Sequence, residues 1–152
     1  APCTPAACME ILDYYGIDCK GKNAVVIGRS LVVGKPAAMM LLKKNATVTV
    51  CHTKTKNIAD ICRNADILVS AAGVLNSLTA DFVRPGQIVI DVSINWDENK
   101  PNARGGLGAI AGDAVFAEVE PIVEAITPVP GGVGSVTTSV LMKHVIEAAE
   151  RA

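Results

Sequence analysis

Two glycines and two polar residues separate an apolar run from a helical pattern in the stretch AVVIGRSLVVGKPAA, Ala24 to Ala38. Gly28 ends the apolar run, Arg29 and Ser30 follow it, and Gly34 precedes the helical pattern. Glycines in a strand-to-helix turn let the backbone approach a pyrophosphate, which the N–H groups at the helix start then bind. The stretch therefore predicts a dinucleotide loop, one residue longer than GxGxxG and with Ser30 in place of its middle glycine.

A loop for a nucleoside triphosphate is a poorer interpretation of the same residues. Such a loop has four residues between its first glycine and a Gly-Lys pair, followed by a Ser or Thr that binds magnesium. Here five residues separate Gly28 from Gly34, and Pro36 stands where the hydroxyl is needed. An ordinary turn without a ligand remains the second alternative.

The next apolar run ends in VCHTKT, Val50 to Thr55, and contains no carboxylate. A carboxylate at this place would bind the ribose hydroxyls of NAD. Thr53, Lys54 and the nearby Arg29 instead offer a hydroxyl and two cations, which suit a 2′-phosphate. We therefore predict NADP rather than NAD as the cofactor, against the alternative of a solvated basic turn, and we expect a structural role for His52.

Small and rigid residues follow two later apolar runs. The sequence AAG at Ala71–Gly73 would let a ribose approach the backbone, or would simply form a turn. The stretch TPVPGGVG at Thr127–Gly134 is expected to face a ligand, with a plain connecting loop as the alternative. Asp91 and Asp113 are the carboxylates expected near the site. Because Asp91 lies within an apolar run, it requires hydrogen-bond partners, and we favour a structural role over a catalytic one.

The elements that must position these residues alternate between strands and helices. This alternation predicts an α/β fold of the Rossmann-like, doubly wound kind, with a mainly parallel sheet and helices on both faces. We expect a polar loop at Asn95–Gly105 and a helical or irregular segment at Val115–Ala125. Helices are expected at Thr4–Tyr15, Lys35–Asn45, Asn57–Asn64 and Val136–Ala152, and strands at Asn23–Ile27, Ala46–Cys51, Asp66–Ala71, Gly86–Ile94 and Ala109–Gly112.

Composition narrows the class of protein. The chain has 152 residues, the size of one domain, and we treat residues 1–152 as a single unit. Its net charge of −1 gives no electrostatic case for nucleic acid, and no apolar run is long enough to cross a membrane. Its five cysteines include no CxxC pair, which favours reduced thiols in a cytoplasmic protein and no metal site.

Seven blocks of this sequence, in order along the whole chain, resemble the bifunctional methylenetetrahydrofolate dehydrogenase/methenyltetrahydrofolate cyclohydrolase family. The resemblance implies the C-terminal, NADP-binding domain of a two-domain enzyme. That enzyme oxidises 5,10-methylenetetrahydrofolate with NADP and hydrolyses the methenyl product to 10-formyltetrahydrofolate. The blocks are PCTP (Pro2–Pro5), VIGRSLVVGKP (Val26–Pro36), NATVTVCHTKT (Asn45–Thr55), ADILVSAAG (Ala65–Gly73), VIDVSIN (Val89–Asn95), GD (Gly112–Asp113) and TPVPGGVG (Thr127–Gly134).

By this similarity, Thr53 joins Arg29 at the 2′-phosphate, and Ile94 lies beside the nicotinamide ring. The segment Pro130–Thr137 would line the cleft between cofactor and folate. The full set of expected cofactor contacts is Gly28, Arg29, Ser30, Gly34, Thr53, Ala72, Gly73, Ile94 and Thr137. The expected substrate-cleft residues are Pro130, Gly131, Gly132, Val133 and Gly134.

The chain departs from the family pattern at two places and lacks one part of it. Ser93 stands where the family usually has Gly, which puts a side chain near the ring, and Ser135–Val136 stand where it usually has Pro–Met. The family's catalytic Lys and Tyr belong to an N-terminal folate domain that no segment here matches. We therefore expect no catalytic residue in this chain, little activity from it alone, and a piece of a longer, homodimeric protein.

Two other functions fit the residues. A non-catalytic nucleotide-binding or regulatory module would need no acid or base. Another NADP dehydrogenase, of the shikimate or methylene-tetrahydromethanopterin type, would use the same cofactor domain. The block PVPGGVG, Pro128 to Gly134, favours folate over these alternatives.

Overall fold

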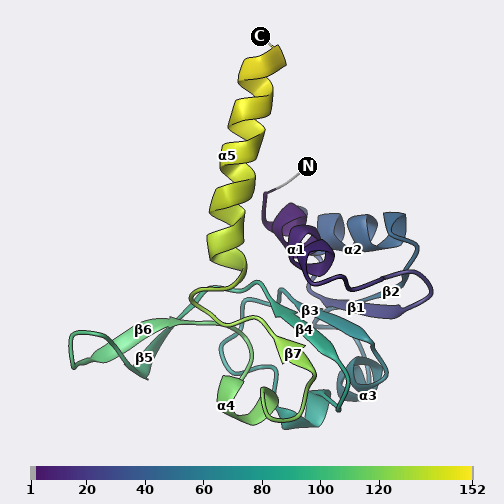
Figure 1. The fold of residues 1–152 in the computed structure, drawn as a ribbon. Coiled ribbons are helices and arrows are strands. Elements are labelled where there is room, and N and C mark those ends of the chain that lie inside the picture. Colours follow the sequence, from purple (N-terminus) through teal and green to yellow (C-terminus); the bar gives the residue numbers. More distant parts are fainter. Residues whose placement is uncertain (1–2, 152) are drawn as a thin grey trace.

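Five parallel strands form the centre of the protein, in the order β2-β1-β3-β4-β7. The computed structural model describes residues 3–151 (Figure 1). Pro2, in the first resemblance block, and Ala152, the expected end of the last helix, lie outside the described residues. The strands of this sheet are β1 (Asn23–Ile27), β2 (Thr47–Cys51), β3 (Ile67–Ser70), β4 (Ile88–Asp91) and β7 (Ala125–Ile126).

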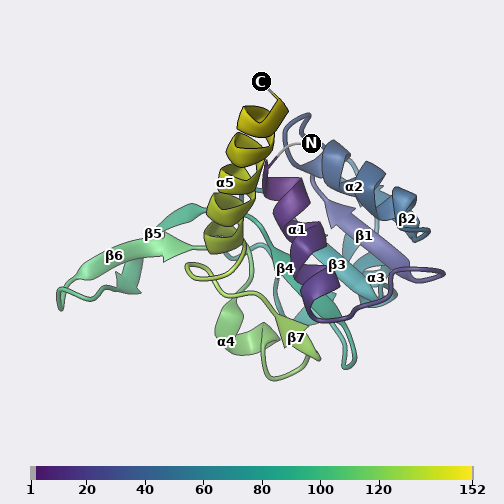
Figure 2. The same ribbon diagram turned by 45° about the horizontal axis from the view of Figure 1, so that its top comes forward.

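Helices cover both faces of this sheet, and they begin and end close to the predicted residues. Figure 1 shows α1 and α2 on one face and α3 on the other, and Figure 2 shows α5 beside α1. The fold is thus the predicted Rossmann-like arrangement, doubly wound around a mainly parallel sheet. The helices are α1 (Cys3–Tyr14), α2 (Gly34–Lys43), α3 (Ile58–Arg63), α4 (Phe116–Val119) and α5 (Val133–Arg151), with a 3₁₀ turn at Ala80–Phe82.

The sheet has one hydrophobic core on each face, because successive side chains along a strand point to opposite faces. In β1, Ala24 and Val26 point into the core that α1, α2 and α5 cover. Val25 and Ile27 point into the opposite core, which α3 and α4 cover. Because both faces are buried, the strand is almost continuously apolar, as a parallel strand between two helix layers must be.

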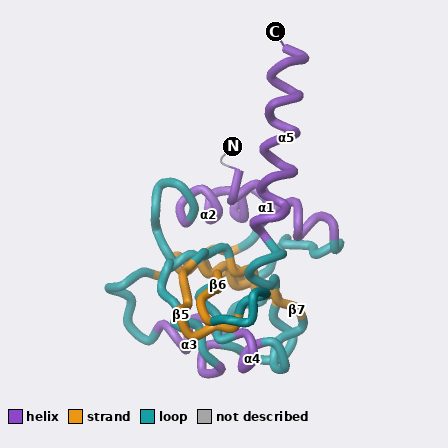
Figure 3. Tube along the Cα trace, turned by 90° about the vertical axis from the view of Figure 1, so that its left-hand side faces the viewer, coloured by secondary structure: helices purple, strands orange, loops and turns teal. Residues whose placement is uncertain are grey.

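The predicted loop at Asn95–Gly105 is wrong, because most of it forms a β-hairpin. Strand β5 (Asn95–Pro101) pairs antiparallel with β6 (Leu107–Ala111), and the hairpin projects away from the main sheet (Figure 1). In Figure 3 this side of the molecule faces the viewer. The polar side chains of β5 suggested a loop, but backbone hydrogen bonds to β6 stabilise the strand without requiring an apolar face.

The C-terminal helix starts earlier than predicted. Helix α5 begins at Val133 rather than Val136, so Val133 and Gly134 belong to its first turn and not to a loop. Its far end projects beyond the sheet (Figure 1). The segment predicted as helical or irregular at Val115–Ala125 contains the short helix α4 and the start of β7.

Candidate functional site

The ends of β1, β2 and β3 meet at Gly28. Its N–H donates to the Cys51 carbonyl oxygen at 2.8 Å, which joins it to the end of β2. Its φ of +116° favours glycine, and a Cβ here would overlap the backbone oxygen of Ala71 after β3. The first predicted glycine is therefore required by the packing of three strand ends.

Ser30 and Gly34 fix the start of α2 against this turn. The Ser30 Oγ accepts the N–H groups of Val33 at 3.1 Å and Gly34 at 3.3 Å. A Cβ on Gly34 would overlap the carbonyl oxygen of Gly28. The serine that replaces the middle glycine thus binds two N–H groups at the start of α2, while Gly34 allows the close approach of helix and strand.

Four successive backbone N–H groups, those of residues 29–32, donate no hydrogen bond within residues 3–151. They follow Gly28 and precede the first turn of α2, whose N-terminus carries a partial positive charge. Consecutive free amides at such a place form an anion-binding concavity. The loop is therefore suited to a pyrophosphate, whose oxygens could accept hydrogen bonds from these four N–H groups.

The turn after β2 presents Thr53 and Lys54 to solvent. Its shape comes from its neighbours: the His52 N–H donates to the Thr55 Oγ1 at 2.8 Å, and the Lys54 N–H donates to the His52 Nδ1 at 3.2 Å. Arg29 is also exposed, and neither it nor Lys54 forms an ion pair with any described residue. Since Ile27 and Cys51 are register partners, Arg29 and Thr53 extend from adjoining strand ends.

Asp113 organises the ends of β3 and β4. Its carboxylate is completely buried and accepts six hydrogen bonds while donating none, which is the pattern of an ionised group. The donors are the hydroxyls of Ser70 and Ser93 at 2.9 and 2.8 Å, the amide of Asn95 at 3.1 Å, and the backbone N–H groups of Ala72, Gly73 and Val74 at 2.9, 3.3 and 2.9 Å.

Asp91 is the second buried carboxylate, and its partners are structural. Its oxygens accept the N–H groups of Ser93 at 3.2 Å and Ala114 at 2.9 Å, and its own N–H donates to the Thr127 Oγ1 at 2.9 Å. Burial raises the pKa of Asp91, with a contribution from the charge of Asp113, while the hydrogen bonds from the backbone oppose the rise. The partners that its buried position requires are thus present.

Ser93 points into the protein, not into the space above the strand ends. It is 8% exposed, and its Oγ both donates to Asp113 and accepts the Gly73 N–H at 3.1 Å. The neighbouring Ile94 is 68% exposed. The extra side chain at position 93 is therefore satisfied internally, and Ile94 is the residue that this turn presents outward.

The segment after β7 joins the site at its opposite side. The Thr127 N–H donates to the Val89 carbonyl oxygen at 3.1 Å, which places the start of the segment beside β4. Lys100 Nζ donates to the carbonyl oxygens of Ile110 at 2.7 Å and Val129 at 3.1 Å, tying the hairpin to the segment. Further on, the Thr137 Oγ1 donates to the Val133 carbonyl oxygen at 2.9 Å inside α5.

The structure thus gathers the predicted residues of β1, β2, β3 and β4 at one edge of the sheet. The remaining predicted residues, from Pro130 to Thr137, begin at that edge and continue into α5. The sequence prediction missed Ser70 and Asn95, which bind Asp113. A polar residue at the end of an apolar strand is the signal that could have found Ser70.

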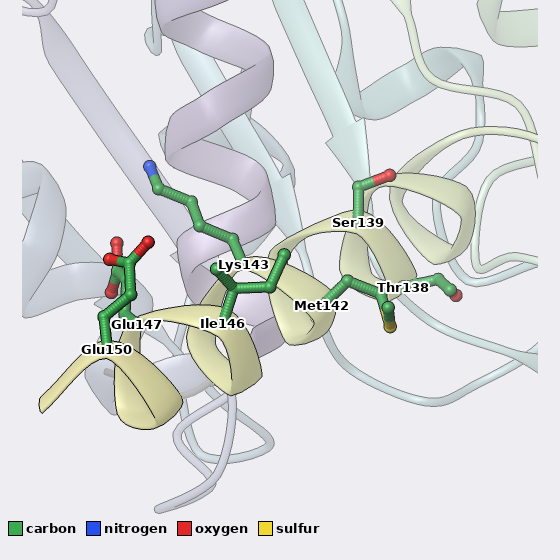
Figure 4. A pocket seen from close by; sticks show the side chains of 7 residues that line it. All are labelled: Thr138, Ser139, Met142, Lys143, Ile146, Glu147 and Glu150. Carbon is green, nitrogen blue, oxygen red and sulfur yellow. The ribbon is translucent and has the colours of Figure 1, made fainter. Parts of the chain in front are cut away.

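A shallow depression runs along α5, separate from these strand ends. Figure 4 shows the seven side chains that line it, all from this helix. In residues 3–151, no group of three or more His, Cys, Asp or Glu side chains is placed to hold a metal ion. Nor does any helix in that range combine the length and apolar character needed to cross a membrane. The lining residues are Thr138, Ser139, Met142, Lys143, Ile146, Glu147 and Glu150.

Comparison with known proteins gives consistent matches over the whole chain. Residues 2–152 match the family described as "Tetrahydrofolate dehydrogenase/cyclohydrolase, NAD(P)-binding domain". The bifunctional protein FolD of Carboxydothermus hydrogenoformans is 60% identical over 149 residues, which are 98% of this chain and 50% of that protein. The chain thus spans about half the length of the curated relatives it matches.

Two solved structures show the same similarity in three dimensions. The FolD methylenetetrahydrofolate dehydrogenase/cyclohydrolase of Campylobacter jejuni has a TM-score of 0.88 at 45% identity, over 99% of this chain and 50% of that one. The Trypanosoma brucei enzyme, solved with NADP cofactor and inhibitor, has a TM-score of 0.89 at 39% identity, over 100% of this chain and 52% of that one.

Proposed function

Because this chain belongs to the tetrahydrofolate dehydrogenase/cyclohydrolase family and matches its NAD(P)-binding domain, we propose that it binds NADP for a folate dehydrogenase. The intact protein would oxidise 5,10-methylenetetrahydrofolate to the methenyl form and hydrolyse that product to 10-formyltetrahydrofolate. The family membership does not favour a separate regulatory module or an NADP dehydrogenase of another family.

The loop from Gly28 to Gly34 is the observation that carries this proposal. Its four unpaired N–H groups would bind the pyrophosphate at the start of α2. Arg29, which has no ion-pair partner among the described residues, would bind the 2′-phosphate together with the hydroxyl of Thr53. A carboxylate, which would repel that phosphate, is absent from the turn after β2.

The role of this chain in hydride transfer is to hold the two reactants in position. Bound NADP supplies the nicotinamide carbon that accepts the hydride. Ala72 and Gly73 after β3, and Ile94 after β4, would hold the nicotinamide half, because ligands bind at the carboxyl ends of such strands. Thr137 would contact the cofactor, and Pro130, Gly131, Gly132 and Gly134 would line the side facing the folate. The expected cleft residue Val133 does not join them, because its side chain is buried in the core that α1, α2 and α5 cover.

We assign folate binding and the acid–base chemistry of hydrolysis to the half of the relatives that this chain does not match. Helix α5 supports the assignment, since its exposed residues include a cluster of large apolar side chains. That face offers a docking surface for an N-terminal domain, and the chain alone should turn over substrate slowly or not at all. The cluster consists of Leu141, Met142, Val145 and Ile146.

We also propose a cytoplasmic homodimer. All five cysteines are free thiols, which suits a reducing compartment. Strand β2 forms an edge of the main sheet and leaves Val50 exposed, so a second chain could cover it. Sedimentation of the intact protein would test the dimer, and a monomer at micromolar concentration would contradict it.

Calorimetry with NADP and NAD tests the cofactor site directly. Arg29→Ala should weaken NADP binding at least about tenfold and change NAD binding little, because only NADP carries the phosphate that Arg29 would bind. Arg104→Ala is the matched control, since Arg104 is an exposed arginine in the hairpin turn. Equal NADP affinity in the Arg29 variant and the wild type would refute the assigned phosphate site.

A further inference from the structure

Within residues 3–151, no cationic side chain pairs with the buried carboxylate of Asp113. All six of its hydrogen-bond donors are neutral groups. Its partner Ser93 also donates its backbone N–H to Asp91, which is a second acidic residue and not a cation. The ion pairs found among the described residues involve other acids, namely Glu10, Asp13, Asp60 and Asp66.

The strand order places this charge under the nicotinamide half of the proposed site. The chain runs from β1 to β2 on one side and then crosses to β3 on the other, so the crevice opens between the ends of β1 and β3. With the pyrophosphate at α2 and the adenosine end at β2, the other half must lie over β3 and β4. Asp113 binds residues from the turns that follow both of these strands.

Two of the hydrogen bonds of Asp113 place it next to the turn that carries Ile94. Asp113 accepts hydrogen bonds from Ser93 and Asn95, the residues on either side of Ile94. Ile94 itself is largely exposed at the strand end. The carboxylate is therefore bound to both neighbours of Ile94, the residue assigned to the nicotinamide ring.

We propose that Asp113 makes the site prefer the oxidised cofactor over the reduced one. The oxidised nicotinamide ring carries a positive charge and the reduced ring carries none, so only the former gains from a nearby buried anion. The bias suits a dehydrogenase, which must bind the oxidised cofactor and release the reduced one. The inference rests on the proposed NADP site.

The test is the ratio of two dissociation constants, for NADP⁺ and for NADPH, measured by calorimetry on the chain and on its variants. Asp113→Asn should raise the ratio Kd(NADP⁺)/Kd(NADPH) at least about fivefold, because it removes the charge and keeps the size of the side chain. Ser93→Ala is the control. It removes one donor but keeps the charge, so it should weaken both cofactors by the same factor.

A ratio within about twofold of the wild type in folded Asp113→Asn would overturn the inference. If that variant does not fold by circular dichroism, Asn95→Lys provides the second test. It places an ammonium beside the intact carboxylate, and the ratio should again rise; an unchanged ratio would again overturn the inference. Failure of the wild type to bind either cofactor would instead refute the proposed function.

Discussion

The Ser93 hydroxyl lies 2.8 Å from the Asp113 carboxylate and donates a hydrogen bond to it. These residues are 20 positions apart and belong to different strand ends, so the bond links the turn after β4 to the segment after β6. It also shows that the Ser93 side chain points into the fold. The Ser93 hydroxyl forms its hydrogen bonds inside the fold and does not extend into the space beside the exposed Ile94.

Replacing Ser93 by glycine should therefore destabilise the fold without improving cofactor binding. The change removes a donor to Asp113 and an acceptor for the Gly73 N–H, and we expect the free energy of unfolding to fall by about 1–3 kcal/mol. Urea unfolding measures the loss, and calorimetry measures NADP binding. A gain in NADP affinity would show that the serine obstructs the site after all.

The two glycines Gly34 and Gly134 should respond in opposite directions to a single added methyl group. In Gly34→Ala the Cβ overlaps the Gly28 carbonyl oxygen, so α2 must move and the free energy of unfolding should fall by about 1–3 kcal/mol. Gly134 has no heavy atom within 4 Å of the added Cβ. Its change to alanine in α5 should raise stability by up to about 1 kcal/mol. Thermal unfolding compares the two, and equal effects would contradict the packing argument.

Much of the fold could be predicted because its strands are short apolar runs between turn residues. Val25 and Ile27 belong to one core and Ala24 and Val26 to the other, and a run buried on both sides is recognisable without knowledge of its neighbours. The hairpin was missed because β5 is polar. Its stability comes from pairing with β6, and the side chains of β5 alone do not indicate that pairing.

The candidate site likewise has one part that the sequence predicts and another part that it does not. The loop at Gly28 and Gly34 is local in sequence, so its glycines and the helix that follows them identify it. The network around Asp113 is not local: Ser70 lies 43 residues away from its acceptor. A buried carboxylate must find donors, but which strand ends supply them depends on the order of strands in the sheet.

Introducing a carboxylate at Thr53 should change the cofactor preference. Thr53→Glu places at the end of β2 the acidic group that binds ribose hydroxyls in NAD-dependent proteins of this fold. It would also repel the 2′-phosphate, so we expect NADP affinity to fall at least about tenfold and NAD affinity to rise. Calorimetry with both cofactors decides the matter, with Thr138→Glu, on exposed α5, as the control. Parallel losses for the two cofactors would argue against the 2′-phosphate site.

The raised pKa of Asp91 predicts a specific dependence of stability on pH. The unfolded chain keeps the ordinary pKa of 3.8 for Asp91, whereas the pKa in the folded protein is higher. At a pH between these two pKa values, Asp91 is protonated in the folded protein and ionised in the unfolded chain. The folded state binds more protons in this window, so the contribution of Asp91 to stability is present at low pH and is lost as pH rises. In urea unfolding from about pH 4 to about pH 8, Asp91→Asn should therefore approach the wild type in stability as pH increases. A stability difference that stays constant across this range would contradict the shift.

The five cysteines should differ sharply in their reaction with an alkylating reagent. Burial raises the pKa of Cys8 to about 12, and burial together with the nearby Cys51 thiol raises that of Cys62 to about 12. Burial also raises the pKa of Cys19 and Cys51, and the thiolate is the form that reacts. Cys3 is only half-buried, at the start of α1, with its Sγ 3.7 Å from the His144 Nδ1.

With iodoacetamide at about pH 8, the folded protein should therefore be modified at Cys3 first, and the other four thiols should react only as the chain unfolds. Mass spectrometry of the peptides locates the label. Unfolding in urea should make all five cysteines reactive, and Cys3→Ser should abolish the fast reaction of the folded protein. Rapid labelling of Cys8 or Cys62 without urea would mean that α1 or α3 opens readily, because both thiols are sealed between these helices and the sheet.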